Sequence, residues 1–309
     1  MAKPRSRLLD YGVYLVVRLG VCLIQACPFE TAHRCADGLA WLVCKLNRRH
    51  NQVARDNLRH AFPQLSEAQR ERLVYEVYRH FCRLVVEVVY LPRIFHVGNW
   101  RRYTEFSDPI HAQRYMDCLL SGRSIMIVTG HFGNWELAGY IVPLLGFKIH
   151  AIARPIDNPY LDRYIRRFRE ATGQKILAKK GDFDTIEAVL ASGGVLATLA
   201  DQDAGQRGLY VEFFGRPAST HKAIALLALE HRVPLVVGGS ARVAEPMHYR
   251  AYIEDVILPE EYEGRPDAAR AITQRYTAAL ERLIRRHPEQ YLWLHRRWKH
   301  QPKAKQKAA

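Results

Sequence analysis

The sequence predicts an α/β fold, in which helices flank a mixed, largely parallel central sheet and an N-terminal helical segment associates with a membrane. Two patterns predict it: short apolar, β-branched runs alternate with helical segments after residue 120, and an apolar stretch opens the chain. With 309 residues, 48% of them apolar, the chain can bury a large core, which excludes global disorder. We expect a membrane-anchor helix at 1–30, a helical region at 31–100, an α/β core at 101–295 and a basic tail at 296–309.

The apolar opening stretch covers residues 11–27 and follows three basic residues, Lys3, Arg5 and Arg7. Arg18 interrupts it and no small-residue cleavage site is evident, so it does not resemble a secretory signal. Because a spanning helix needs about 20 apolar residues with few charges, we favour a helix lying in the membrane interface, with Arg18 reaching towards the head groups. The alternatives are a spanning helix with its basic flank in the cytoplasm, or an ordinary core helix.

The helical region is predicted from Thr31 to about Trp100. It contains a basic helix at 48–59 and a second helix that Ser66 opens, with apolar residues recurring every three or four positions. We expect the strands of the sheet at 124–129, 149–153, 195–199, 234–238 and 249–257. Helical patterns follow some of these strands at 159–172 and 186–191, and a late amphipathic helix covers 268–286.

The chain is strongly basic, with 46 Lys and Arg against 31 Asp and Glu and a net charge of +15. This excess favours an anionic partner: nucleic acid, anionic lipid or an acidic carrier protein. The six cysteines form no Cys-x-x-Cys pair and have no histidine at zinc-site spacing. We expect them to be small buried side chains in a protein of a reducing compartment.

The most informative stretch runs from Gly130 to Glu136 and reads Gly-His-Phe-Gly-Asn-Trp-Glu. It puts His131 and Glu136 five residues apart, directly after the predicted strand at 124–129. A histidine at a strand exit can accept a proton near neutral pH, and a nearby carboxylate can fix its tautomer. The alternative is a core histidine beside an exposed glutamate.

Polar side chains follow two further predicted strands. Arg154 comes directly after the strand at 149–153, and Asp201 and Gln202 follow the strand at 195–199. Because ligands of open α/β sheets bind outside the carboxyl ends of the strands, we expect His131, Arg154 and Asp201 at one edge of the sheet. Arg154 can supply positive charge to a phosphate, carboxylate or developing oxyanion, or instead pair with Asp157 or Asp201.

Two aromatic clusters lie nearer the C-terminus. Phe213 and Phe214 precede a glycine and could line an apolar slot for a lipid chain, or pack in the core. The stretch 293–299 interleaves two tryptophans with basic residues, a pattern typical of a membrane boundary or a single-stranded nucleic-acid site.

Other enzyme classes leave no mark in the chain, which has no Gly-x-Ser-x-Gly, no phosphate-binding loop motif and no His-Glu-x-x-His. Without an obvious serine or cysteine nucleophile, direct attack by a substrate hydroxyl, with His131 as the base, becomes the favoured chemistry.

The sequence resembles the lysophospholipid acyltransferase superfamily and, within it, the late lipid A acyltransferases (lauroyl and myristoyl transferases). His131 and Glu136 match the superfamily pattern of His, four residues, then an acid (HX4E), in the form His-Phe-Gly-Asn-Trp-Glu. Further matches follow in order along the chain: Asn57-Leu58 with Phe62-Pro63, Ala153-Arg154-Pro155 with Asp157-Asn158-Pro159, Asp201-Gln202, Phe213-Phe214-Gly215 and His295-Arg296-Arg297-Trp298.

This resemblance implies transfer of a fatty acyl group from a thioester of acyl carrier protein or coenzyme A to a hydroxyl of an anionic glycolipid. His131 would be the general base, Glu136 would orient it, and Arg154 would bind the head group or stabilise the oxyanion. Asp201, Gln202, Phe213 and Phe214 would complete the substrate site, without a metal or other cofactor. The basic surface would then serve the membrane and the acyl carrier protein, not nucleic acid, at the cytoplasmic face of a bacterial inner membrane.

Three alternatives remain at this point. Phosphatidylinositol mannoside acyltransferases and other lysophospholipid acyltransferases share much of the pattern. A metal-dependent hydrolase could use His131, Glu136, Asp201, Asp203 and His221, although their spacing matches no common metal site. A non-catalytic protein that binds anionic lipid or nucleic acid would also account for the charge.

Overall fold

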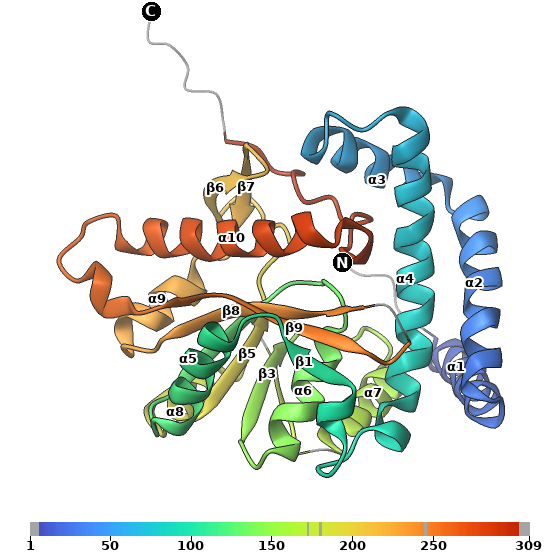
Figure 1. The fold of residues 1–309 in the computed structure, drawn as a ribbon, viewed down its shortest axis with the longest axis horizontal. Helices are drawn as coiled ribbons and strands as arrows, with labels where there is room; N and C mark the ends of the chain where they lie inside the picture. Colours follow the sequence, from blue (N-terminus) through green and yellow to red (C-terminus); the bar gives the residue numbers. More distant parts are fainter. Residues whose placement is uncertain (1–5, 172, 179–180, 244–245, 303–309) are drawn as a thin grey trace, which may run out of the picture.

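The computed structural model describes residues 6–302 except 172, 179–180 and 244–245. It begins with four helices, which are α1 (Arg7–Ala26), α2 (Phe29–Leu46), α3 (Arg48–Ala61) and α4 (Glu67–Ile94). Ser66 caps α4 through the reciprocal hydrogen bonds of a capping box with Gln69, as its sequence predicts. Helices α2 and α4 lie side by side at one end of the molecule (Figure 1).

A seven-stranded sheet follows, in the order β1-β9-β8-β2-β5-β3-β4. Its strands are β1 (Thr104–Phe106), β2 (Ile125–Thr129), β3 (Ile149–Ala153), β4 (Lys175–Ala178), β5 (Val195–Leu199), β8 (Leu235–Arg242) and β9 (Tyr249–Ile257). Only the β8–β9 pair is antiparallel among the described pairings of this sheet. The mixed, largely parallel sheet predicted from the sequence is therefore confirmed. A separate hairpin pairs β6 (Leu209–Phe213) with β7 (Arg216–Thr220).

Strand β2 lies at the centre of the sheet, and all five of its residues are buried. Met126 and Val128 face one hydrophobic cluster, whereas Ile125 and Ile127 face another. Helices α8 (Phe183–Ala191), α9 (Ala223–Glu230) and α10 (Ala268–Arg286) cover the first face. Helices α5 (Pro109–Leu120) and α6 (Trp135–Leu144) cover the second, and α7 (Pro159–Glu170) packs beside β4. Both faces of the sheet are thus occupied, as a continuous apolar strand requires.

The five strands expected from the sequence match β2, β3, β5, β8 and β9, and the late helix matches α10. The sequence analysis did not identify β1, β4, the β6–β7 hairpin, α5 or α9. It also missed three short 3-10 helices, at Trp100–Arg102, Pro259–Tyr262 and Pro288–Gln290.

Helix α1 is long and apolar enough to cross a membrane by length and composition. Its apolar side chains, among them Val16 and Leu19, are mostly exposed. Arg18 is exposed, and its guanidinium lies 4.9 Å from the centre of the Tyr164 ring on α7. Asn158, at the start of α7, donates to the main-chain oxygen of Asp10 at 2.8 Å. Arg18, in the middle of α1, thus contacts α7 through its guanidinium, and the other exposed side chains around it are mostly apolar.

Two expectations from the sequence differ from the structure. All six cysteines are free, but none is buried, and Cys22 and Cys35 are exposed on α1 and α2. The basic tail was expected from residue 296, yet Arg297 is 2% exposed and Trp298 is 8% exposed. Both side chains belong to the core, and the rest of that tail, 303–309, lies outside the described residues.

A buried ion pair links α4 to the sheet. The Glu87 carboxylate is fully buried and accepts hydrogen bonds from Arg242 at the end of β8, from Tyr249 at 2.7 Å and from His33 of α2 at 3.3 Å. Burial alone would raise the pKa of Glu87, but Arg242 and these hydrogen bonds lower it to about 2. The charged pair is therefore held together inside the protein.

The same network reaches the turn that contains His131. Tyr249 accepts a hydrogen bond from Asn134 at 3.0 Å, and His80 of α4 donates from Nε2 to the Gly133 carbonyl at 3.2 Å. Arg242 lies 3.2 Å from Nδ1 of His80. Burial and this arginine lower the pKa of His80 to about 3, so its ring is neutral at neutral pH. Helix α4 thus supports the turn after β2 through polar contacts.

We expect the free energy of unfolding to fall as the pH is lowered from 7 to 5. The pKa of His80 is near 3 in the folded chain against 6.5 in a free side chain, so the unfolded chain takes up the proton first. The stability that the folded chain gains by keeping His80 neutral is fully present above pH 6.5, and it is lost progressively as the pH falls towards 3. It amounts to about 2 kcal/mol between pH 7 and 5.

Urea unfolding at the two pH values measures this effect, and a His80→Gln variant should show a smaller difference between them. His50→Gln is the matched control because His50 is exposed, and it should keep the wild-type difference. An unchanged pH dependence in His80→Gln contradicts the prediction.

Candidate active site

The register of two neighbouring strands brings His131 and Asp201 together. Thr129, the last residue of β2, pairs with Leu199, the last residue of β5. His131 and Asp201 each follow two residues later, at the carboxyl edge of the sheet. The Nδ1 atom of His131 lies 2.9 Å from Oδ1 of Asp201.

An ionised Asp201 beside His131 is the arrangement expected for a general base that a carboxylate orients. Asp201 is 4% exposed; burial alone would raise the pKa of its carboxyl, but His131 lowers it. Asp201 therefore accepts a hydrogen bond from Nδ1, which leaves Nε2 of His131 as the basic nitrogen. In the described part of the chain Nε2 has no protein partner, and the side chain is 21% exposed. The imidazole can therefore accept a proton from a bound hydroxyl.

Two glycines permit the close approach of the strand ends. A Cβ on Gly130 would lie 3.1 Å from the Cβ of Asp201. Gly133 has a φ of +54°, and a Cβ there would lie 1.9 Å from the Ser240 carbonyl oxygen. Substitution of Gly133 would therefore displace the turn from β8. The next residue, Asn134, caps α6 through its side chain.

Glu136 lies in the first turn of α6, where its carboxylate accepts two hydrogen bonds from Arg169 of α7, one of them at 3.0 Å. The indole of Trp135 donates to the same carboxylate at 3.1 Å, and its ring centre lies 5.2 Å from that of His131. Among the described contacts, the imidazole therefore has Asp201 as its acid partner, and Glu136 instead bonds the indole of Trp135, which packs against the imidazole. The sequence analysis did not identify Arg169.

Arg154 directly follows β3 at the same edge of the sheet, as expected from the sequence. Its side chain is 81% exposed and donates to Asp157 at 3.2 Å. Gln202 is half-buried beside Asp201. The parallel strands thus gather these residues, but Arg154 extends into solvent.

Phe213 and Phe214 are 2% and 5% exposed, at the end of β6. They pack in a cluster with Phe62 and the two tryptophans Trp293 and Trp298. This arrangement is the core packing that the sequence left open as an alternative. The tryptophans of the 293–299 stretch are buried with them.

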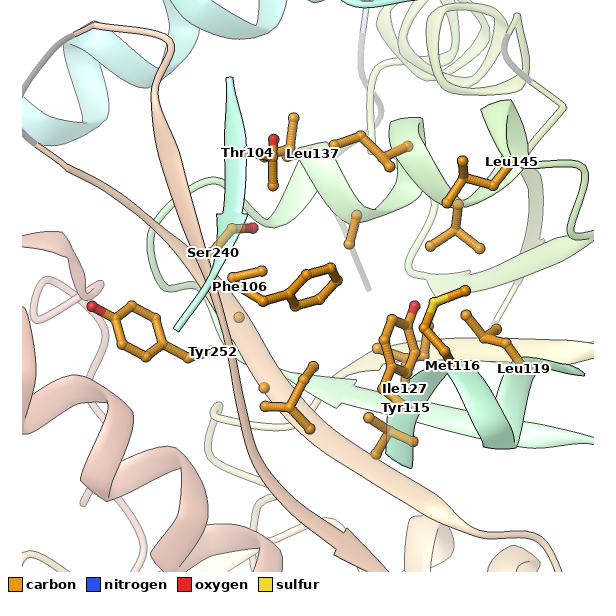
Figure 2. Close-up of a pocket in the computed structure, with 18 of the residues that line it drawn as sticks. Thr104, Phe106, Tyr115, Met116, Leu119, Ile127, Leu137, Leu145, Ser240 and Tyr252 are labelled. Carbon is orange, nitrogen blue, oxygen red and sulfur yellow. The ribbon is translucent and has the colours of Figure 1, made fainter. Parts of the chain in front are cut away.

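An apolar cavity lies elsewhere, between the sheet and helices α5 and α6, and has a volume of about 680 Å³. Figure 2 shows Phe106 of β1, Tyr115 and Met116 of α5, and Leu137 of α6 around it. Thr129 and Trp135, on either side of His131 in the sequence, also line the cavity. It extends to Phe147, which precedes β3 and lies at the opposite edge of the sheet. An apolar space of this size, lined in part by the Trp135 ring that packs against His131, suits a long hydrocarbon chain.

Within the described residues, one group of three metal-ligand side chains has its ligand atoms within 4.8 Å of one another. It consists of Glu187, Glu230 and His231, far in the sequence from the carboxyl-edge residues. The five residues of the metal-hydrolase alternative form no such group there, so the geometry gives that alternative no support.

A family model and individual relatives both relate this chain to one family of enzymes. Residues 1–300 match the bacterial lipid A biosynthesis acyltransferases. The chain is 28% identical over 260 residues to the lipid A biosynthesis palmitoleoyltransferase of Escherichia coli, covering 82% of this chain and 80% of the relative. It is 26% identical over 288 residues to the lauroyltransferase of the same organism, covering 91% and 89%.

A more distant relative is the phosphatidylinositol mannoside acyltransferase of Mycolicibacterium smegmatis, 26% identical over 155 residues, or 48% of this chain and 49% of the relative. The lipid A enzymes match over most of the chain, whereas this match covers half. The family resemblance predicted from the ordered motifs is therefore confirmed. The chain belongs to the bacterial lipid A biosynthesis acyltransferase family, and it is an acyltransferase.

Proposed function

We propose that this acyltransferase moves a fatty acyl group from a thioester, carried by acyl carrier protein or coenzyme A, to a hydroxyl of a glycolipid such as a lipid A precursor. One observation carries the proposal: Trp135, whose ring centre lies 5.2 Å from that of the Asp201-bonded His131, also lines the apolar cavity. The family and its relatives, which are named for lipid A acylation, support the choice of acceptor.

In the proposed reaction, Nε2 of His131 takes the proton of the acceptor hydroxyl. The oxygen attacks the thioester carbonyl carbon and forms a tetrahedral oxyanion. Collapse of this intermediate breaks the carbon–sulfur bond, and the departing thiolate takes the proton back from the imidazolium. Asp201 holds the ring by its Nδ1–H and stabilises the imidazolium. No metal or other cofactor is required by this sequence of steps.

The cavity would hold the acyl chain of the donor, with its carbonyl near Thr129 and Trp135 and its far end near Phe147. Each methylene that leaves water contributes about 0.8 kcal/mol to binding. An acyl chain that ends before Phe147 would leave apolar space unfilled, and a longer acyl chain would clash with the Phe147 ring. The depth of the cavity would therefore select the chain length.

The membrane would supply the acceptor. The exposed apolar face of α1 suits the hydrocarbon region of a bilayer, and the net charge of +15 suits anionic lipid and an acidic carrier protein. Arg154, exposed at the carboxyl edge, is available to an anionic head group. We place the enzyme at the cytoplasmic face of the bacterial inner membrane.

The second candidate is acylation of a phosphatidylinositol mannoside, which the half-length match to the mycobacterial relative favours. Mass spectrometry of membrane glycolipids from cells with and without this protein would separate the two acceptors, because the acylated lipid gains one fatty acyl unit.

Removing the acid that holds the imidazole should reduce catalysis. We expect Asp201→Asn to lower kcat by about 10²–10⁴-fold, because the amide does not stabilise the imidazolium, and His131→Ala to lower it at least as much. The assay follows acyl transfer from acyl carrier protein or coenzyme A to a lipid A precursor. If Glu136→Gln loses more activity than Asp201→Asn, Glu136 is the orienting acid that the sequence predicted. Full activity in His131→Ala would refute the role of the base.

Enlarging the far end of the cavity should change the preferred donor. We expect Phe147→Ala to shift the best substrate to a longer acyl chain, measured as kcat/KM across a series of acyl thioesters. Phe183→Ala makes the same substitution at a ring that is 54% exposed on α8, outside the cavity lining, and should leave the preference unchanged. A preference that is identical in Phe147→Ala and the wild type would exclude Phe147 as the end of the acyl site.

Charges on the outer face of α1 should weaken membrane binding. Leu19→Asp places a carboxylate at a side chain that is 61% exposed on α1, so we expect a smaller fraction of the protein to sediment with anionic vesicles. Ile110→Asp is the matched control, because Ile110 is 69% exposed on α5. Equal losses from both substitutions would show that α1 is not the contact.

A further inference from the structure

The segment that follows α10, residues 288–298, lies against the His131–Asp201 pair. Its Leu292 amide donates to the His131 carbonyl at 3.1 Å, and its Tyr291 pairs with Phe132 as a β-bridge. The Tyr291 hydroxyl lies 3.5 Å from the main-chain oxygen of Asp201. This C-terminal segment is thus tied to the turns that carry both members of the pair.

His295 in this segment is held from two sides. The main-chain amide of Asp203 donates to its Nε2 at 3.0 Å. Its own carbonyl accepts a hydrogen bond from Asn57 of α3 at 2.8 Å. Because a main-chain amide can only donate, Nε2 must be the acceptor, and the neutral ring carries its proton on Nδ1. The tautomer of His295 is therefore set by the fold.

The Nδ1–H of His295 is a donor without a protein partner in the described part of the chain, and the side chain is half-buried. Burial is the main cause that lowers the pKa of His295; among nearby charges, Asp201 opposes this shift, and Arg297 and His131 add to it. The ring therefore stays neutral at neutral pH. It offers a fixed, uncharged hydrogen-bond donor three residues after Leu292, which bonds the His131 carbonyl, and it is itself held by Asp203, two residues after Asp201.

We propose that His295 is a catalytic residue whose Nδ1–H donates a hydrogen bond to the thioester carbonyl oxygen as that oxygen becomes an oxyanion. This inference rests on the proposed function, because attack by a hydroxyl on a thioester creates that negative charge. A donor held in place before the reaction stabilises the transition state without reorganisation, and a neutral imidazole can serve as such a donor. Arg154, the other candidate for this role, is 81% exposed and paired with Asp157.

A matched pair of substitutions separates the proposed role from a purely structural one. His295→Gln places an oxygen where Nε2 lies, so it can keep the bond to Asp203 but loses the Nδ1 donor. His295→Asn places an amide nitrogen where Nδ1 lies, so it can keep the donor but loses the bond to Asp203. We expect His295→Gln to lower kcat by about 10²-fold with KM little changed, and His295→Asn to lower it about tenfold less than that. The opposite order would overturn the proposal in favour of a structural role.

Thioester hydrolysis without an acceptor gives the second measurement. An oxyanion donor acts on water attack too, so His295→Gln should slow single-turnover hydrolysis of the acyl thioester and acyl transfer by similar factors. Loss of transfer alone would mean that His295 binds the acceptor, which overturns the proposal. Thermal unfolding of both variants identifies any loss caused by misfolding. If the wild type transfers no acyl group, the proposed function fails. If the wild type is active and His295→Gln is equally active, only the inference about His295 fails.

Discussion

The pairing of β2 with β5 is the constraint on which the site depends. Thr129 lies opposite Leu199 at the ends of the two strands. His131 and Asp201 each follow two residues later, and so the imidazole lies beside the carboxylate. A shift of one residue in this register would point the side chains of β5 to the other face and separate His131 from Asp201. Both faces of β2 are packed and its other edge is paired with β8, so the strand is held on every side against such a shift.

The buried polar contacts explain how the turn after β2 stays fixed at the carboxyl edge of this sheet. Hydrogen bonds hold the turn on several sides. His80 bonds the Gly133 carbonyl, Asn134 bonds Tyr249 and the Ser240 carbonyl, and the C-terminal segment bonds the His131 carbonyl. Trp135 packs against the imidazole, and its indole is bonded to Glu136, which Arg169 pairs with. A carboxylate that pairs with arginine is poorly placed to share a proton with histidine. This division gives the two acids different tasks: Asp201 bonds the ring and Glu136 fixes the indole that packs on it.

Local patterns in the sequence were sufficient for the central strands, because each is a short apolar run bounded by turn residues. They also placed His131, Arg154 and Asp201 at one edge, since parallel strands end together. The acid beside His131 could not be predicted, because Asp201 reaches it only through the β2–β5 register, a long-range property. Strand β7 reads Arg-Pro-Ala-Ser-Thr and lacks an apolar run, so it was missed. Whether Phe213 lines a slot or fills the core depends on Trp298, which no local pattern could bring to it.

The helical region before the sheet is part of the site rather than an attachment to it. Asn57 of α3 bonds the main chain at Trp293 and His295, and His80 and Glu87 of α4 support the turn and the end of β8. Helix α2 joins the same network through His33, and α1 packs on α7, the helix that supplies Arg169 to Glu136. Helix α1, which presents the exposed apolar face, is therefore connected to the imidazole through α7, Glu136 and Trp135.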